Sequence, residues 1–193
     1  TAEDDKTESV MLRAGIPSDG KYICFALRQW KGFEEKAALF GKAAKYAYET
    51  YGLTPVFVSV DRQLDPHTGR MAAANLDIPH YFLDDAGSAG TIIGALSRMD
   101  VVISMRLHAL IFAAGQGIPL AGVVYDPKVS AFLRYIGQDL FEDLSALTEE
   151  TLRTMVDQTV AQTKHPEAQA AAVKRLQALE HGNLEVAQRL LEL

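Results

Sequence analysis

The chain alternates between two hydrophobic patterns. Short continuous apolar runs, typical of strands buried on both faces of a parallel sheet, are followed by segments whose apolar residues recur at helical spacing. The expected strands cover residues 21–27, 55–60, 80–83, 101–104 and 119–124. The expected helices cover residues 33–51, 65–75, 91–99 and 106–114, and a further helix begins at Pro127. This alternation, with its short connections, predicts an α/β fold: a doubly wound, Rossmann-like parallel sheet with helices on both faces.

The two ends of the chain differ from this alternating region. Residues 1–19 lack periodicity, and we interpret them as a linker or arm that precedes one domain over residues 20–193. No strand is expected after Leu140. Amphipathic helices are expected instead at residues 148–161 and 166–193, the second of them bent or broken near residues 181–183. We interpret these helices as packing elements around the sheet, without chemistry of their own.

Composition narrows the possible functions. The chain has 193 residues, of which 48% are hydrophobic and 23% charged, as in ordinary soluble globular proteins. Its net charge of -6 argues against a general nucleic-acid binder, because neutralising phosphates requires a basic face. The single cysteine, Cys24, lies in an apolar run and is expected to be a buried, inert thiol. No cluster of metal ligands is visible in the sequence, so neither a metal nor a cofactor is expected.

The sequence also indicates where the protein resides. A single cysteine excludes an intramolecular disulfide, which fits a reducing compartment. The first residues are acidic and polar, unlike a signal peptide, and the longest apolar run, residues 109–125, is interrupted by Gly115, Gly117 and Pro119. We therefore expect no transmembrane segment and predict a cytoplasmic location.

Candidate chemistry is concentrated where the fourth expected strand ends. An apolar, β-branched run leads into Arg106 and His108, and the first strand ends at Arg28. In the usual doubly wound order these two strands are neighbours at the switch point, so both arginines should face one crevice. His108 lies in the first turn of the next helix, where backbone N–H groups favour an anion. These groups predict a site for a small, multiply charged anion carrying phosphate or carboxylate.

Several other residues are weaker candidates. Lys128, just after the fifth strand, could add a positive charge at the rim of the site. Asp84 and Asp85 could bind a ribose, although solvated loop carboxylates are the commoner case. The loop at residues 87–90 could hold phosphate through backbone amides, but neither a Walker-type P-loop nor a G-x-G-x-x-G motif is present. Trp30 is expected to pack under its loop rather than to stack on a ligand.

Each candidate in the main site also has a plain structural interpretation. An arginine at a strand end is often a surface side chain, and a histidine in a first helical turn is often a packing or capping residue. Convergence at the expected switch point favours function for Arg106 and His108.

The sequence around these residues resembles a known family. The segment from Met105 to Ala113, with Gly117-Ile118-Pro119 and the segment from Tyr125 to Val129, is similar to the signature of polysaccharide pyruvyl transferases, particularly the CsaB type. The first strand, with Arg28 and Trp30, resembles that family's arginine-bearing strand. The resemblance runs from about residue 20 to residue 140, and Arg-Leu-His is its most specific part.

The resemblance carries expectations about architecture and reaction. Family members resemble two-domain GT-B glycosyltransferases, and this chain matches only the C-terminal half, so an N-terminal domain of the same protein is expected as a partner. The family transfers pyruvyl from phosphoenolpyruvate to two hydroxyls of one sugar, giving a cyclic ketal. The CsaB branch modifies cell-wall polysaccharide that anchors surface-layer proteins. A cell-wall polysaccharide or its lipid-linked precursor is then the expected acceptor, and the inner membrane face a place where the enzyme would work.

Residue roles follow from the same resemblance. Arg28 and Arg106 would bind the phosphate and carboxylate of phosphoenolpyruvate, and Leu107 would contribute mainly through its backbone. His108 would be the general acid that protonates the enol methylene. The acceptor would sit in the cleft between domains, so this chain alone is expected to bind donor but to turn over poorly.

Two other functions remain open at this point. The chain could be the C-terminal domain of a nucleotide-sugar-dependent GT-B glycosyltransferase, with acidic ligands for a nucleoside. It could also be a non-catalytic module that binds carbohydrate or a protein partner.

Overall fold

The computed structural model describes residues 2–191, with side chains described from residue 3 to residue 178. A six-stranded, wholly parallel sheet forms its centre, in the order β3-β2-β1-β4-β5-β6. The strands are β1 (Tyr22–Ala26), β2 (Thr54–Val58), β3 (Tyr81–Leu83), β4 (Val101–Ser104), β5 (Leu120–Val124) and β6 (Phe141–Asp143). This order confirms the doubly wound prediction, and it places β1 beside β4.

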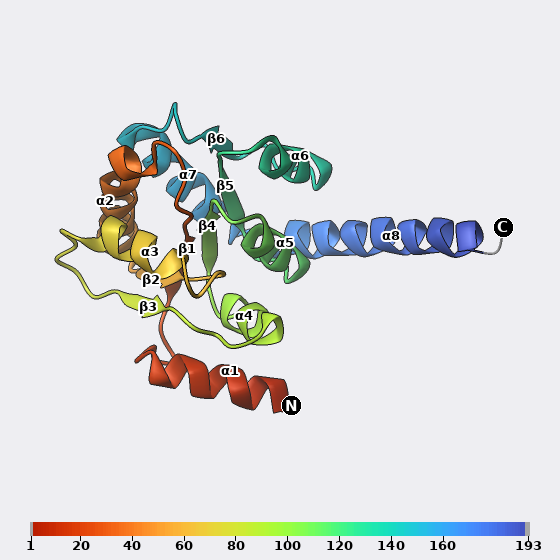
Figure 1. Ribbon diagram of the computed structural model, residues 1–193, viewed down its shortest axis with the longest axis horizontal. Helices are drawn as coiled ribbons and strands as arrows, with labels where there is room; N and C mark the ends of the chain where they lie inside the picture. Colours follow the sequence, from red (N-terminus) through yellow and green to blue (C-terminus); the bar gives the residue numbers. More distant parts are fainter. Residues whose placement is uncertain (1, 192–193) are drawn as a thin grey trace.

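Helices cover both faces of the sheet (Figure 1). One face packs against α2 (Phe33–Tyr51), α3 (Asp65–Ala73) and α7 (Glu149–Gln162). The other packs against α4 (Ala89–Leu96), α5 (Leu107–Gly115) and α6 (Pro127–Tyr135). Two terminal helices lie outside these layers: α1 (Ala2–Arg13) contacts α4, and α8 (Pro166–Leu191) contacts α5 and extends away from the sheet.

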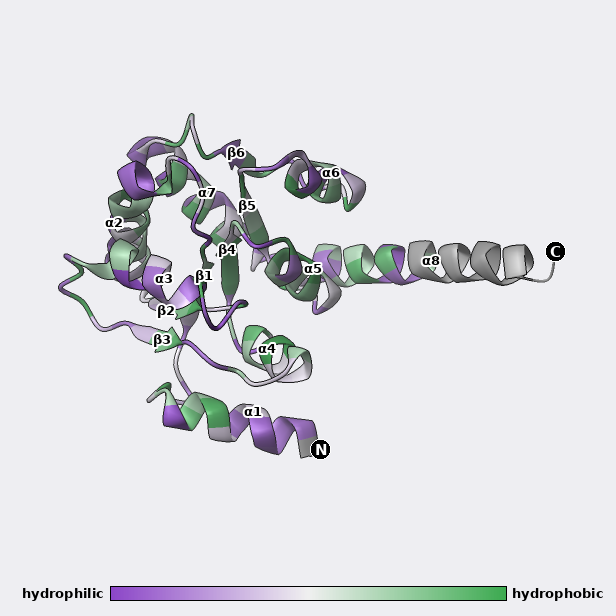
Figure 2. Ribbon diagram, viewed as in Figure 1, coloured by the Kyte–Doolittle hydropathy of each residue, from purple (hydrophilic) through white to green (hydrophobic). Residues whose placement is uncertain are grey.

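Alternating side chains of the buried strands supply the two halves of the core. Ile23 and Phe25 of β1 point toward α2, whereas Cys24 and Ala26 point toward the α4–α5 side. Every residue of β1, β4 and β5 is buried, which explains why these strands read as continuous apolar runs. The strands at the centre of the sheet are accordingly hydrophobic along their length in Figure 2.

The expectation that no strand follows Leu140 is wrong. β6 is a three-residue edge strand that pairs in parallel with β5, with Phe141 opposite Gly122. A run of three residues is too short to show a period of two in the sequence, and its place at the sheet edge needs no continuous apolar run.

The N-terminal segment also differs from its prediction. Residues read as a linker without regular structure include helix α1, whose Val10 and Met11 are buried among the α4 side of the core. A surface helix with few apolar positions carries a weak periodic signal, and its stability comes from packing. Whether residues 1–19 join this domain to another one stays a prediction.

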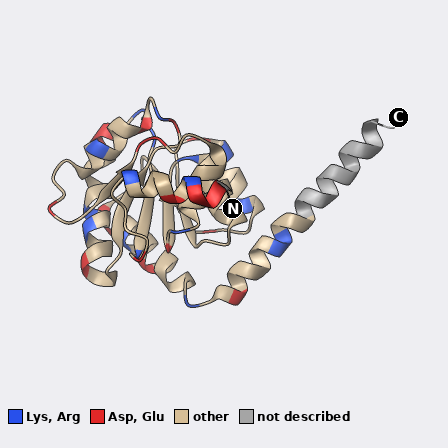
Figure 3. Ribbon diagram, turned by 90° about the horizontal axis from the view of Figure 1, so that it is seen from below, with Lys and Arg blue, Asp and Glu red and all other residues tan. Residues whose placement is uncertain are grey.

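At the other end, α8 is one helix from Pro166 to Leu191, without the break expected near residues 181–183. The side chains at that point lie outside the described residues. Across residues 2–191, no helix combines the length and the apolar character needed to cross a bilayer. In the view of Figure 3, acidic and basic residues are interspersed along the ribbon.

Candidate functional site

Arg106 lies between the end of β4 and the start of α5, and hydrogen bonds hold its backbone in place. The Ser104 hydroxyl accepts a hydrogen bond from the Arg106 N–H at 2.9 Å and lies 3.2 Å from the Ala26 carbonyl, to which it can donate. Arg106 is the extended N-cap residue of α5, with φ -78° and ψ 116°. The ends of β1 and β4 are thereby joined beside the first turn of a helix, where unpaired N–H groups and the helix dipole favour an anion.

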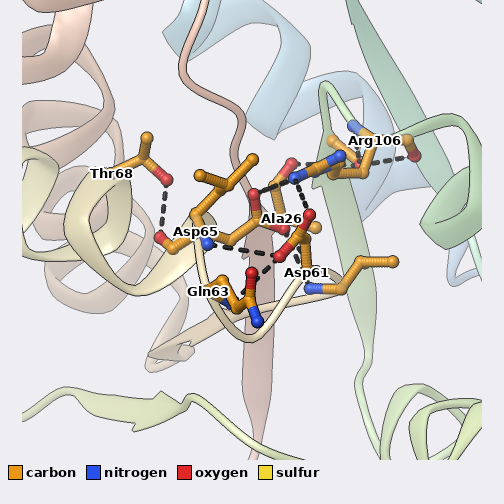
Figure 4. Close-up of polar contacts among 9 residues, drawn as sticks. Ala26, Asp61, Gln63, Asp65, Thr68 and Arg106 are labelled. Carbon is orange, nitrogen blue, oxygen red and sulfur yellow. Dashed lines mark hydrogen bonds and ion pairs between the residues drawn. The ribbon is translucent and has the colours of Figure 1, made fainter.

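A buried carboxylate fixes the Arg106 side chain (Figure 4). Asp65, the first residue of α3, accepts hydrogen bonds through Oδ1 from Nε of Arg106 at 3.0 Å and from Nη2. The side chains are only 10% exposed for Arg106 and 1% for Asp65. The second oxygen of Asp65 accepts the N–H groups of Val60 and Asp61 at 3.0 and 2.8 Å. Both oxygens of this carboxylate are therefore engaged, and the pair ties the end of β4 to the loop after β2.

Asp61 lies closer to solvent in the same loop. One of its oxygens is 4.0 Å from Nη2 of Arg106, and its side chain is 40% exposed. The Gln63 N–H, which donates to Asp61 at 2.9 Å, is the main reason why the pKa of Asp61 lies below its ordinary value. The charges of Arg106 and Arg28 lower this pKa further. Both arginines therefore act on one carboxylate, as expected for side chains that share the carboxyl edge of the sheet.

Arg28 follows the buried end of β1 and is held by aromatic rings. Its guanidinium carbon lies 5.6 Å from the ring centroid of Trp30 and 5.4 Å from that of Tyr125. The two rings are 4.7 Å apart, so the loops after β1 and β5 touch each other across the end of β4. Trp30 therefore packs against a residue of another loop and remains 40% exposed. These contacts hold the guanidinium against ring faces without requiring a carboxylate partner.

His108 is exposed and faces a separate cavity. A hollow of about 310 Å³ is lined by His108 together with the loops after β2 and β3 and the start of α4. Val60 and Arg62, which flank Asp61, line this hollow, and Phe112 lies beside the imidazole with a centroid separation of 6.2 Å. Neither Arg28 nor Arg106 lines it. The structure therefore places both arginines at the carboxyl edge where β1 and β4 end side by side, and places His108 on the neighbouring side of the same edge.

Lys128, the expected rim residue, interacts with a carboxylate of its own loop instead of lying free at the site. Lys128 is about half exposed, and its Nζ lies 3.9 Å from Asp126, whose other oxygen caps α6 by accepting the Lys128 N–H. Asp126 and Pro127 thus begin α6 as N-cap and first residue. Leu107 is half-buried at the first position of α5, with its backbone at the helix start.

The two carboxylates in the loop after β3, Asp84 and Asp85, have different surroundings. Asp84 is engaged by Arg70, with Nη2 at 2.6 Å, which favours the structural interpretation of that carboxylate. Asp85 lines the hollow beside His108 and lies 4.0 Å from Arg62. The hydroxyl of Ser88 caps α4 by accepting the Thr91 N–H at 3.1 Å, so the Gly-Ser loop is organised as a helix start.

Sequence reasoning missed Asp61 and Asp65. A usable signal was present, because Asp61 lies in the loop after a buried strand that neighbours β1, and Asp65 begins the helix that follows this loop. Their partner could not be identified in this way, since the pairing with Arg106 depends on how α3 packs.

Comparison with protein-family models shows the family of the chain. The model of the polysaccharide pyruvyl transferase family matches residues 3–127, about two thirds of the chain. The chain belongs to this family. The matched segment includes Arg28, Asp61, Asp65, Arg106 and His108 and ends just before Lys128. No curated protein matches the chain.

Solved structures similar to this pyruvyl transferase family member share its fold at low identity. A glycosyl transferase family 9 protein from Veillonella parvula DSM 2008 is 13% identical, with TM-score 0.62 over 84% of this chain and 52% of that one. ADP-heptose lipopolysaccharide heptosyltransferase II from E. coli is 12% identical, with TM-score 0.63 over 83% of this chain and 52% of that chain. A third similar structure, a putative UDP-N-acetylglucosamine 2-epimerase from Listeria monocytogenes, is 16% identical, with TM-score 0.54 over 96% of this chain and 52% of that chain.

These similarities confirm a Rossmann-like fold of the kind found in GT-B transferases, within a transferase family. The chain spans about half the length of these structures.

Proposed function

We propose that this chain is the donor-binding half of a polysaccharide pyruvyl transferase and that its donor is phosphoenolpyruvate. The observation that carries the proposal is the pair Arg28 and Arg106, which follow the ends of the neighbouring strands β1 and β4 beside the first turn of α5. Phosphoenolpyruvate carries a phosphate and a carboxylate on the same carbon, and guanidinium groups bind both kinds of anion in a bidentate manner. The family assignment supports the same reaction class.

In the proposed mechanism, Arg28 and Arg106 hold the two anionic groups while the N–H groups at the start of α5, including that of Leu107, face the donor. Protonated His108, which would reach the donor from the hollow on the neighbouring side of the same edge, gives its proton to the methylene carbon and makes the central carbon electrophilic. A sugar hydroxyl oxygen then bonds to this carbon. A second hydroxyl of the same sugar displaces phosphate, which leaves with the electron pair of the broken C–O bond. The two hydroxyl protons restore imidazolium at His108 and protonate the released phosphate.

The acceptor in this proposal is a cell-wall polysaccharide or its lipid-linked precursor. Its binding groups would come largely from a second, N-terminal domain, across a cleft that the His108 hollow and Lys128 would border. The proposed location is the cytoplasm, where a lipid-linked acceptor would be reached at the inner face of the membrane.

Isothermal titration calorimetry with phosphoenolpyruvate tests the donor assignment. Charge-assisted hydrogen bonds contribute about 1.5–3 kcal/mol each, so Arg28→Ala should weaken binding about 10- to 100-fold. Arg153→Ala is the matched control, since Arg153 is a half-exposed arginine on α7 that pairs with Glu149, and its affinity should equal that of the unaltered protein. Binding that survives Arg28→Ala and Arg106→Gln unchanged would show that the site is misplaced.

The fold similarity also supports one alternative, a nucleotide-sugar glycosyltransferase. One similar structure, the glycosyltransferase VinC, is a complex with dTDP, at 17% identity and TM-score 0.57 over 90% of this chain and 43% of that chain. Titration of a UDP- or dTDP-sugar into the same protein separates the two functions, because binding of the nucleotide sugar without binding of phosphoenolpyruvate would refute the pyruvyl proposal. A non-catalytic module would bind neither donor.

A further inference from the structure

Asp65 is the most completely engaged carboxylate at the site. Its side chain is 1% exposed, and four hydrogen bonds reach it, two from Arg106 and two from the backbone of residues 60 and 61. Its own α3 starts at this residue, and the next turn is tied back through Thr68, whose hydroxyl donates to the Asp65 carbonyl at 2.7 Å. The carboxylate is therefore immobile, and it holds the guanidinium that it binds.

Stability alone is a weak reason for such a pair. Removing two charges from water costs about as much as their attraction returns, so a well-packed hydrophobic pair would stabilise a fold equally well. The pair instead fixes the orientation of the Arg106 guanidinium. With Nε and Nη2 engaged by Asp65, the remaining nitrogen, Nη1, finds no acceptor among the described residues.

Arg28 provides a contrast within the same site. It is held by the faces of Trp30 and Tyr125, and no carboxylate in the described part of the chain lies within ion-pair distance of it. Ring faces limit a guanidinium to a plane but leave it free to turn within that plane. One arginine is thus fixed before any ligand arrives, and the other can adjust to it.

We infer that Asp65 is a positioning residue: it acts through Arg106, fixing that guanidinium in the orientation that binds the donor anion. The inference rests on the proposed function for its ligand. Holding a binding group in place beforehand removes the ordering cost that a free arginine side chain would add to binding.

The orientation itself can be measured without a ligand. In protein labelled with 15N-arginine, the Nε–H resonance of Arg106, assigned by its loss in Arg106→Gln, should exchange slowly with solvent because Asp65 accepts it. Asp65→Asn should release that proton to fast exchange. A resonance that stays protected in Asp65→Asn overturns the inference, whether or not phosphoenolpyruvate binds.

The consequence for binding is tested with phosphoenolpyruvate and a double variant. Asp65→Asn should weaken binding about tenfold or more, the range of one charge-assisted hydrogen bond. In Arg106→Gln, the further change Asp65→Asn should not weaken binding any more, because Asp65 affects the ligand only by orienting Arg106. Additive losses, or an unchanged affinity in Asp65→Asn, refute a role through Arg106.

A matched control separates positioning from general weakening of the fold. Asp157 on α7 accepts hydrogen bonds from Tyr46 and Tyr51, at 2.8 and 2.6 Å, far along the chain from the site. Asp157→Asn removes a comparable charge and should leave both the Arg106 resonance and the affinity unchanged. If unaltered protein binds no phosphoenolpyruvate while Asp65→Asn still frees the Arg106 proton, the donor assignment fails and the positioning of Arg106 stands.

Discussion

The close approach of α2 to α3 controls where Asp65 lies, and Gly41 makes that approach possible. An added Cβ at Gly41 would run into the backbone carbonyl oxygen of Ala72 on α3, an atom that cannot rotate away as a flexible side chain can. Gly41→Ala therefore forces the two helices apart. Overpacking of this kind costs about 1–3 kcal/mol. The better helix propensity of alanine offsets about 1 kcal/mol of this cost, so we expect a net loss of stability of about 0–2 kcal/mol.

The matched control is Gly115→Ala near the end of α5, where an added Cβ meets nothing within 4 Å. That variant keeps the propensity gain without the clash, so it should equal or exceed the parent protein in stability. Urea unfolding followed by circular dichroism measures both free energies of unfolding. Equal stability of Gly41→Ala and Gly115→Ala would refute tight α2–α3 packing. A shifted α3 should also weaken phosphoenolpyruvate binding in Gly41→Ala, because it carries Asp65 with it.

Three further predictions concern single groups. Burial raises the pKa of the Cys24 thiol, so it should react with a thiol reagent at pH 8 only as fast as the protein unfolds, and rapid labelling of native protein would contradict its burial. The pKa of Asp61 is lowered below 3.8, mainly by the Gln63 N–H. Ionised Asp61 therefore stabilises the folded state above pH 3.8, and this stabilisation is lost as the pH falls through the lower pKa of the folded state. Carboxyl NMR should show Asp61 titrating below 3.8, and a pKa at the ordinary value would refute the contact with Gln63. Lys128→Ala should weaken phosphoenolpyruvate binding less than Arg28→Ala does, because Lys128 is exposed and already near Asp126; an equal loss would place Lys128 within the site.

The central part of the fold was predictable because it depends on local pattern. Continuous apolar runs identified β1 and β4, and the strand order that places them side by side follows from the usual doubly wound connections. That adjacency was enough to bring Arg28 and Arg106 to one edge. β6 and α1 were missed because a three-residue edge strand has no measurable period and a polar surface helix owes its stability to packing.

The partners of the site residues were harder to predict. Asp65 contacts Arg106 across 41 positions of sequence, and nothing in the local pattern indicates that α3 starts beneath the end of β4. His108 follows Arg106 by two positions in the sequence, yet it lines a hollow that neither arginine lines. In the helix, residues two positions apart point in different directions, so His108 faces the hollow over β2 and β3 instead.

The long-range Asp65–Arg106 pair has a practical consequence for finding ligands. Because it joins the loop after β2 to the end of β4, the anion site exists only in folded protein. A ligand that binds only the folded state raises its stability by about 2.7 kcal/mol when present at a hundred times its dissociation constant. For a domain of this size that corresponds to a melting temperature higher by roughly 5–10 °C. A thermal-shift screen of small phosphates and carboxylates would therefore rank donors before any acceptor sugar is known.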